Sequence, residues 1–309
     1  MVGLLEHEAA VVLGAAIDAA LVPAQPQHSE GIASLTESEL IVSLRQEVAS
    51  LRRRVLSQTR HGERSAAAPG SGVALHRDLC TSAVPTVRGA EIDVVYQPAE
   101  AVGGDAYTAV RLDEHRVAIA MIDATGHGVG ASVLAAYVQH SMRAALRRAA
   151  QDEHACPSKI LQAVNRDVCD AHLSDCQFVA AVVVLYDERS RMVRLARAGM
   201  PYPVRLSRSD ASSKLEPGGP LLGAVELATF PEVALSLEPG DTLVLHTDGL
   251  EHCLADPAGR PHPDVAGSVW LRSLQHRDLT AALAGLDGLC GGDHAEDDVT
   301  VITLRVDRV

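Results

Sequence analysis

Apolar residues follow two different patterns along the chain, and the change between them divides it into regions. In the first region they recur every three or four positions, as an amphipathic helix requires: Ile41, Leu44, Val48, Leu51 and Val55. Beyond about residue 75, short apolar runs predict strands at 91–97, 116–123, 178–187, 191–199, 241–248 and 298–306. We therefore expect a helical N-terminal region at 1–60, a flexible linker at 61–74 and a folded domain at 75–309.

The folded domain is expected to mix sheets and helices in layers. Helical patterns occur at about 128–149, 158–171, 262–274 and 278–289. The runs 178–187 and 191–199 are separated only by a short break, which predicts a hairpin, and short connections favour antiparallel sheets. Because the helices gather in two places, we expect them to cover the sheets as layers of an α+β fold.

The N-terminal helical pattern allows two interpretations. Its apolar seam resembles that of a coiled coil, so residues 37–57 could form a homodimer. The seam lasts only about two heptads, which is short for an isolated coiled coil, so a helix packed on its own domain fits equally well.

Composition and charge narrow the class of protein. The 309 residues are 47% hydrophobic but only 3% aromatic, so Ala, Val, Leu and Ile must build the core. The net charge of −13 repels phosphate backbones and argues against a nucleic-acid partner. The apolar run 9–22 is interrupted by Asp18 and is too short to span a membrane. With no basic leader and no C-x-x-C pair among six cysteines, we expect a cytoplasmic protein.

Acidic residues stand at the ends of several apolar strands, where a strand would not normally carry them. They are Asp105 after two glycines, Asp123, Asp248, and the pair Asp297 and Asp298. Each alone could be a turn residue or a helix cap. Together, two carboxylates 4 Å apart would repel by about 4 kcal/mol at an effective dielectric near 20, and no Lys or Arg adjoins them in sequence. Carboxylate and carbonyl oxygens suit Mg²⁺ or Mn²⁺, so the pattern predicts a divalent-cation site.

Six ordered motifs carry a family resemblance. They are "YQPAEAVGGDAY", "IDATGHGVGAS", "RAGMPYPVRL", "GGPLLGAVE", "LEPGDTLVLHTDGLEH" and "DDVTVITLRV". From about His76 to Val306, the chain resembles the SpoIIE/RsbU-type family of bacterial PPM phosphatases, the metal-dependent protein serine/threonine phosphatases. The resemblance implies a four-layer α-β-β-α sandwich of two antiparallel sheets, with a two-metal centre at one end.

The resemblance also implies a role for individual residues. Asp105, Asp123, Asp248 and Asp297 match the family's catalytic metal ligands, and the carbonyl of Ala124 matches a main-chain ligand. Asp298 matches an orienting group or the start of a strand. The implied cofactor is two Mn²⁺ or Mg²⁺ ions. The implied reaction is hydrolysis of phosphoserine or phosphothreonine on a protein partner by a metal-bridging water. The implied partner is a small phosphorylated protein of the anti-sigma-factor antagonist type, in a partner-switching pathway.

Several positions depart from the family pattern and keep a second interpretation open. Ala106 and Thr108 stand where relatives usually have an aromatic residue and an acid. Met200 replaces a frequent His, and Arg197 replaces an Asn. The changes at positions 106, 108 and 200 would suit a catalytically degenerate scaffold that only binds a partner, although a scaffold has no need to keep mutually repelling acids. His127 fits a turn histidine better than a general acid, and no phosphate-binding arginine can be named.

Overall fold

The computed structural model describes residues 71–126, 128–173, 177–208, 211–254, 265–274 and 297–307. The predicted N-terminal helices, the dimerisation seam at 37–57 and the helix at 278–289 lie outside these ranges. Helix α3 (Ser71–Cys80) begins within the segment expected to be a linker, and the domain boundary itself stays a prediction. The described residues from His76 onward belong to one compact unit.

That unit contains two five-stranded antiparallel sheets. The first, called the β10 sheet, has the order β1 (Ala90–Gln97), β10 (Val299–Val306), β9 (Thr242–His246), β6 (Val204–Leu206) and β7 (Ser212–Lys214). The second, called the β3 sheet, has the order β2 (Asp105–Arg111), β3 (Arg116–Ala124), β4 (Val179–Asp187), β5 (Met192–Ala198) and β8 (Glu232–Ser236). The predicted hairpin is present as the antiparallel β4–β5 pair.

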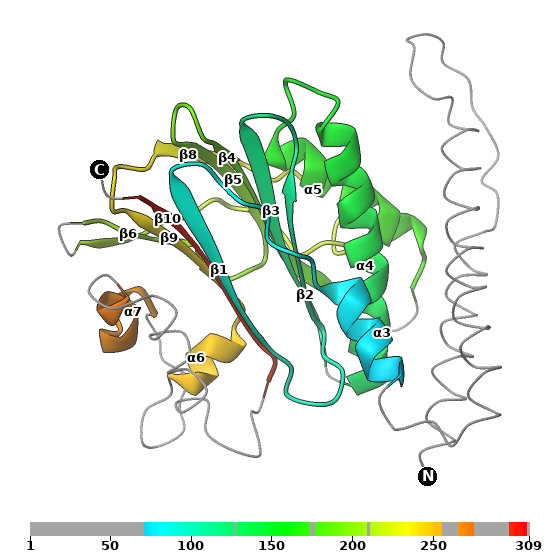
Figure 1. The fold of residues 1–309 in the computed structure, drawn as a ribbon. Coiled ribbons are helices and arrows are strands. Elements are labelled where there is room, and N and C mark those ends of the chain that lie inside the picture. The colour runs from blue at the N-terminus through cyan, green and yellow to red at the C-terminus, as the bar shows by residue number, and fades with distance from the viewer. Residues whose placement is uncertain are drawn as a thin grey trace, which may run out of the picture. The chain divides into compact units, whose positions relative to one another are not determined.

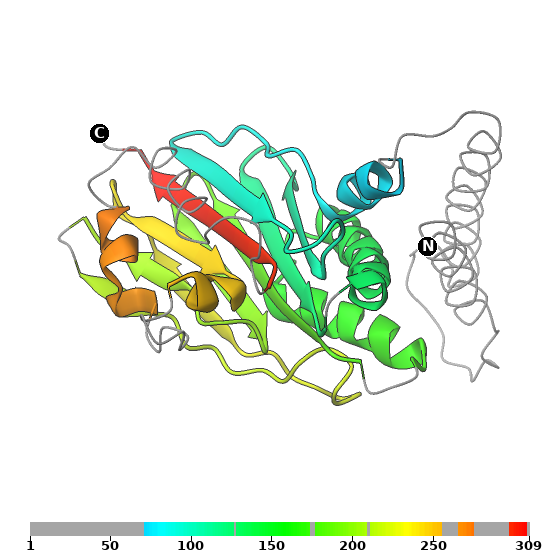
Figure 2. The same cartoon turned by 90° about the horizontal axis from the view of Figure 1, so that it is seen from below.

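Helices cover the outer face of each sheet (Figures 1 and 2). Helices α4 (Gly128–Ala149) and α5 (Pro157–Asp170) lie on the β3 sheet, and they begin and end close to the predicted residues. On the other side lie α6 (Gly249–Cys253), a 3₁₀ turn (Val265–Gly267) and α7 (Val269–Ser273). The expected α+β sandwich is thereby confirmed. The helix predicted at 262–274 is corrected, because its described part is a 3₁₀ turn followed by a short helix.

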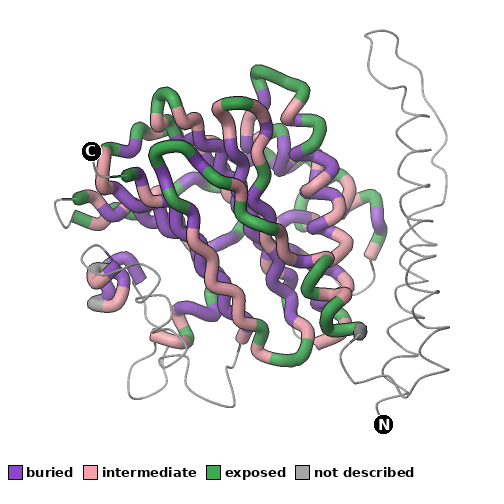
Figure 3. Tube along the Cα trace, in the orientation of Figure 1, coloured by how far each residue is buried: buried purple, intermediate pink, exposed green. Residues whose placement is uncertain are grey.

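Three apolar clusters fill the spaces between the layers, and buried residues are concentrated along the strands and along the helices that cover them (Figure 3). Strand β5 contributes to two of these clusters: Ala196 and Ala198 pack toward α4 and α5, whereas Val193 and Leu195 pack between the two sheets. This is the period-two alternation of a strand buried on both faces. A third cluster lies between the β10 sheet and α6 and α7. The buried residues are mainly Ala, Val, Leu and Ile, as the composition required.

Strands β6, β7 and β8 were not predicted. They are only three to five residues long, and β7 reads "SSK", with no apolar residue to signal a strand. Their positions follow from pairing with longer strands, namely β6 with β9 and β8 with β5.

Two further observations bear on the setting of the protein. No helix among the described residues is long and apolar enough to cross a membrane. Cys80, Cys156 and Cys169 are free, whereas Cys253 is disulfide-bonded. The cytoplasmic location remains a prediction.

Candidate metal centre

Two of the predicted acids are partners across one sheet. Asp105 begins β2 and is paired with Asp123 near the end of β3. The Asp105 side chain is only 1% exposed, and its Oδ2 accepts hydrogen bonds from Thr300 Oγ1 at 2.5 Å and Thr247 Oγ1 at 3.0 Å. Burial, and then the charge of Asp123, raise the pKa of Asp105 well above its usual value, against the effect of the threonine hydroxyls. Asp105 is therefore an acid held in place below the surface.

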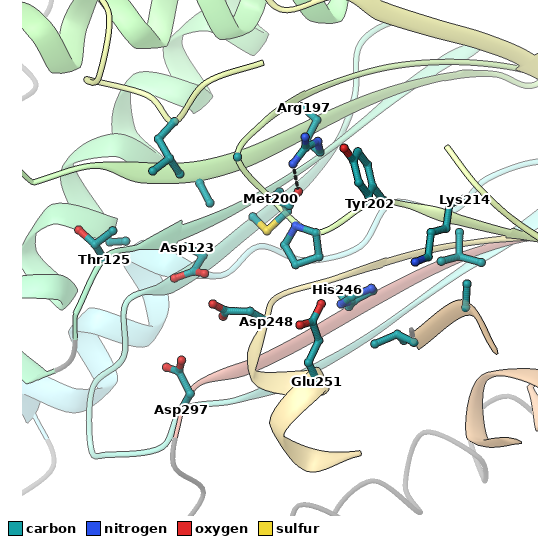
Figure 4. Close-up of a pocket in the computed structure, with 18 of the residues that line it drawn as sticks. Asp123, Thr125, Arg197, Met200, Tyr202, Lys214, His246, Asp248, Glu251 and Asp297 are labelled. Atoms are coloured by element: carbon teal, nitrogen blue, oxygen red, sulfur yellow. Dashed lines mark hydrogen bonds between the residues drawn. The ribbon is translucent and has the colours of Figure 1, made fainter. Parts of the chain in front are cut away.

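Three other acids line one pocket of about 680 Å³ (Figure 4). They are Asp123 on β3, Asp248 immediately before α6, and Asp297 two residues before β10. The labelled carboxyl groups point toward the same space from three separate elements. Ala124 lines the pocket beside Asp123, as expected for a residue whose carbonyl could serve as a ligand.

The acids in the pocket act on one another electrostatically. Burial, the charges of Asp248 and Asp297 and a hydrogen bond with Asp248 together raise the pKa of Asp123 to about 8. Burial also raises the pKa of Asp297, and the nearby charges of Asp248 and Asp298 act in the same direction. The pocket therefore concentrates negative charge at a cost that a cation would offset.

Asp298 has a different role from its neighbour Asp297. Its Oδ1 accepts a hydrogen bond from the Ala99 N–H at 2.7 Å, and its Oδ2 accepts one from the Gly104 N–H at 2.5 Å. A Cβ added at Gly103 would overlap this carboxylate. Asp298 thus fixes the turn that delivers Asp105, which is the orienting role expected from the sequence.

The donors in the pocket fit a hard divalent cation by their chemistry. In the described part of the chain, no Lys or Arg forms an ion pair with Asp105, Asp123, Asp248 or Asp297. No three His, Cys, Asp or Glu side chains of the described ranges are grouped closely enough to hold one ion as they stand. A bound cation would therefore have to draw the carboxylates inward, and oxygen donors of this kind suit Mg²⁺ and Mn²⁺. The ligand assignments remain predictions.

The pocket also contains residues that the sequence analysis did not assign to the site. They are Arg197, Tyr202, Lys214, His246 and Glu251. Arg197 and Tyr202 lie in the motif "RAGMPYPVRL", and His246 and Glu251 lie in "LEPGDTLVLHTDGLEH", but nothing in either motif indicates that these residues share one pocket. His127, considered above as a turn histidine, lies outside the described residues.

Comparison with known proteins places this chain in a family. Residues 113–307 match the family model described as Stage II sporulation protein E (SpoIIE). The phosphoserine phosphatase RsbU of Bacillus subtilis (strain 168) is 24% identical over 192 residues, which cover 62% of this chain and 55% of RsbU. The chain thus spans about half the length of this curated relative.

Solved structures show the same fold. The SiaA-PP2C domain of Pseudomonas aeruginosa aligns with a TM-score of 0.65 at 20% identity, covering 76% of this chain and 94% of that domain. The catalytic domain of the serine/threonine protein phosphatase PstP, in complex with two manganese ions, aligns with a TM-score of 0.52 at 16% identity, covering 71% and 98%. These likenesses concern the fold, whereas the match to the family model covers more than half of the sequence. The chain belongs to the SpoIIE family and has the fold of PP2C-type (PPM) phosphatases.

Proposed function

We propose that this protein is a metal-dependent protein serine/threonine phosphatase that hydrolyses phosphoserine or phosphothreonine on a protein partner. The observation that carries the proposal is the pocket in which Asp123, Asp248 and Asp297 converge without an ion pair to Lys or Arg in the described residues. Membership of the SpoIIE family and the likeness to RsbU, named a phosphoserine phosphatase, support the same reaction.

Each acid would contribute in its own way. Two cations, Mn²⁺ or Mg²⁺, would be held by Asp123, Asp248, Asp297 and the Ala124 carbonyl. Asp105, the cross-strand partner of Asp123, would be the remaining ligand. When bound, such cations neutralise charge on phosphoryl oxygens and lower the pKa of a water molecule. Asp298, Thr247 and Thr300 would keep Asp105 and its turn in position, because their hydrogen bonds leave the carboxylate little freedom.

The partner follows from the family resemblance rather than from the pocket alone. We propose a small phosphorylated protein of the anti-sigma-factor antagonist type, in a partner-switching pathway. The pocket opens at the surface through the exposed Asp248, so a phosphorylated side chain on a folded partner has access to it. A homodimer through residues 37–57 remains a separate prediction.

The test is hydrolysis of a phosphoserine peptide and of p-nitrophenyl phosphate by the full chain, with Mn²⁺, with Mg²⁺ and with EDTA. We expect turnover that needs metal and falls at least 100-fold in Asp248→Asn, because the amide cannot replace an anionic ligand. Asp170→Asn is the matched control, since Asp170 is exposed at the end of α5, outside the pocket. Turnover that is indifferent to EDTA would contradict the proposal. Absence of both turnover and metal binding would favour the partner-binding scaffold.

A further inference from the structure

The wall of the pocket opposite the acids is built around Arg197. This residue lies near the end of β5, where the chain leaves the β3 sheet and crosses to β6 of the β10 sheet. Its Nε donates a hydrogen bond to the Pro217 carbonyl at 3.1 Å, and its Nη1 donates one to the Met200 carbonyl. The guanidinium carbon lies 4.3 Å from the centroid of the Tyr202 ring. The guanidinium plane is thus held by two carbonyls and one aromatic face.

The backbone around Arg197 is fixed as firmly as its side chain. Gly199 has a φ of +70°, and a Cβ there would overlap the side chain of Leu221. A Cβ at Gly219 would overlap the carbonyl of Arg197 itself. The crossing and the segment near Gly219 therefore pack without spare room, and the position of Arg197 is preorganised before any ligand arrives.

Arg197 does not neutralise the acids of its own pocket. Within the described residues it forms no ion pair, and its Nη2 donates to no protein acceptor. In Figure 4, Met200 lies between Arg197 and Asp123, and Met200 is buried. Lys214 lines the same pocket and is its second basic residue. A fixed cation is therefore kept apart from the anions in one shared cavity.

We propose that Arg197, stacked on Tyr202, binds a carboxylate side chain of the protein substrate that lies close in sequence to the phosphorylated residue. This inference rests on the proposed function, because it makes Arg197 a specificity-determining residue of the same site. The Nη2 group, which donates to no protein acceptor in the described residues, can donate to a carboxylate, and the charges of the two groups are complementary. The separation by Met200 favours a neighbouring side chain over the phosphoryl group, which belongs beside Asp123 and Asp248. The half-exposed Tyr202 marks the side from which a peptide would enter.

The experiment compares two phosphoserine peptides that differ only in the residues next to the phosphoserine, Glu in one and Gln in the other. With Mn²⁺ and the full chain, we expect kcat/KM to be about tenfold higher for the Glu peptide. Arg197→Ala should lower this ratio to about one. Arg197→Lys should leave an intermediate ratio, because Lys keeps the charge but loses the guanidinium that the two carbonyls hold in place. Arg194→Ala is the matched control. Arg194 lies on the same strand but pairs with Glu232 outside the pocket, so its removal should keep the preference.

A second readout separates this inference from the proposed function. Fluorescence anisotropy with labelled Glu and Gln peptides that carry Ala in place of phosphoserine measures binding without turnover. We expect tighter binding of the Glu peptide, and loss of the difference in Arg197→Ala. Preference in binding without any hydrolysis would leave the subsite standing and sink the phosphatase proposal. Hydrolysis with no Glu preference in either assay, or a preference that survives Arg197→Ala, would overturn the subsite.

Discussion

Thr300 donates a hydrogen bond from its hydroxyl to the carboxylate of Asp105 at 2.5 Å. This bond joins β10 of one sheet to β2, which is the edge strand of the other. Thr300 lies on β10, and Asp105 begins β2 in the opposite sheet. Both side chains are fully or almost fully buried. The position of a predicted metal ligand therefore depends on how the two sheets are packed together.

Replacing Thr300 by Val should weaken the proposed metal centre without changing its proposed ligands. The variant keeps the shape of the side chain but leaves Asp105 with only the hydroxyl of Thr247 as a side-chain donor. We expect Mn²⁺ affinity to fall about 10-fold to 100-fold, in line with the loss of other partners of metal ligands. We also expect the free energy of unfolding to fall by about 1–3 kcal/mol. Titration of activity against Mn²⁺ and urea unfolding measure the two effects.

Thr303 offers a matched control on the same strand. Its hydroxyl is buried and has no hydrogen-bond partner in the described structure. Thr303→Val removes that unpartnered group at nearly constant volume, so it should leave stability unchanged or raise it. Equal losses of stability and Mn²⁺ affinity in both variants would contradict the role given to Thr300.

Both the stability of the fold and Mn²⁺-dependent turnover should depend on Asp298. Asp298→Ala would leave the N–H groups of Ala99 and Gly104 without their acceptor, at a cost of about 1–3 kcal/mol in the free energy of unfolding. The turn that carries Asp105 would loosen, and Mn²⁺-dependent turnover should drop with it. Asp170→Ala, at an exposed site, should change neither urea midpoint nor turnover. A fully active and stable Asp298→Ala variant would refute this assignment.

The pH dependence of stability can be tested away from the pocket, at Glu188. Burial alone would raise the pKa of Glu188, but hydrogen bonds from the Arg111 side chain and the Arg88 N–H outweigh it and hold the pKa below its usual 4.5. A carboxyl group with a lowered folded-state pKa stabilises the fold above its unfolded pKa and loses this effect as the pH falls. Urea midpoints from pH 7 to pH 3 measure it.

The matched variant for this test is Glu188→Gln. At pH 7 it should be less stable than the parent protein by about 1 kcal/mol or less, since the pairs with Arg88 and Arg111 are partly exposed. The difference should shrink toward zero below the folded-state pKa of Glu188. A difference that stayed constant over this range would show that the charge of Glu188 is not its cause.

The parts of the fold that could be predicted are those in which the spacing of apolar residues reflects how the element is buried. The run at 116–123 became β3, and the helices at 128–149 and 158–171 became α4 and α5, because burial on a sheet or under a helix imposes a period. Strand β7 has no such pattern, since its three residues are polar and its position is set by pairing with β6.

The same distinction explains the site. Asp123, Asp248 and Asp297 were predictable because an acid at the end of an apolar strand is conspicuous, and the strand ends meet at one pocket. Asp105 could be predicted as a site residue. Its hydrogen bonds with Thr247 and Thr300 could not, because no sequence pattern indicates these two partners. The position of Arg197 depends on how the chain crosses from one sheet to the other, so only the structure shows that it lines the same pocket as the acids.

Titration calorimetry of Mn²⁺ into the metal-free full chain is the decisive measurement of whether the acids at the strand ends form a cation site. We expect binding of two ions per chain, with at least one lost or weakened more than tenfold in Asp123→Asn, while Asp170→Asn binds as the parent protein does. No measurable Mn²⁺ or Mg²⁺ binding to the folded parent protein, or binding that is unchanged in Asp123→Asn, would contradict this expectation.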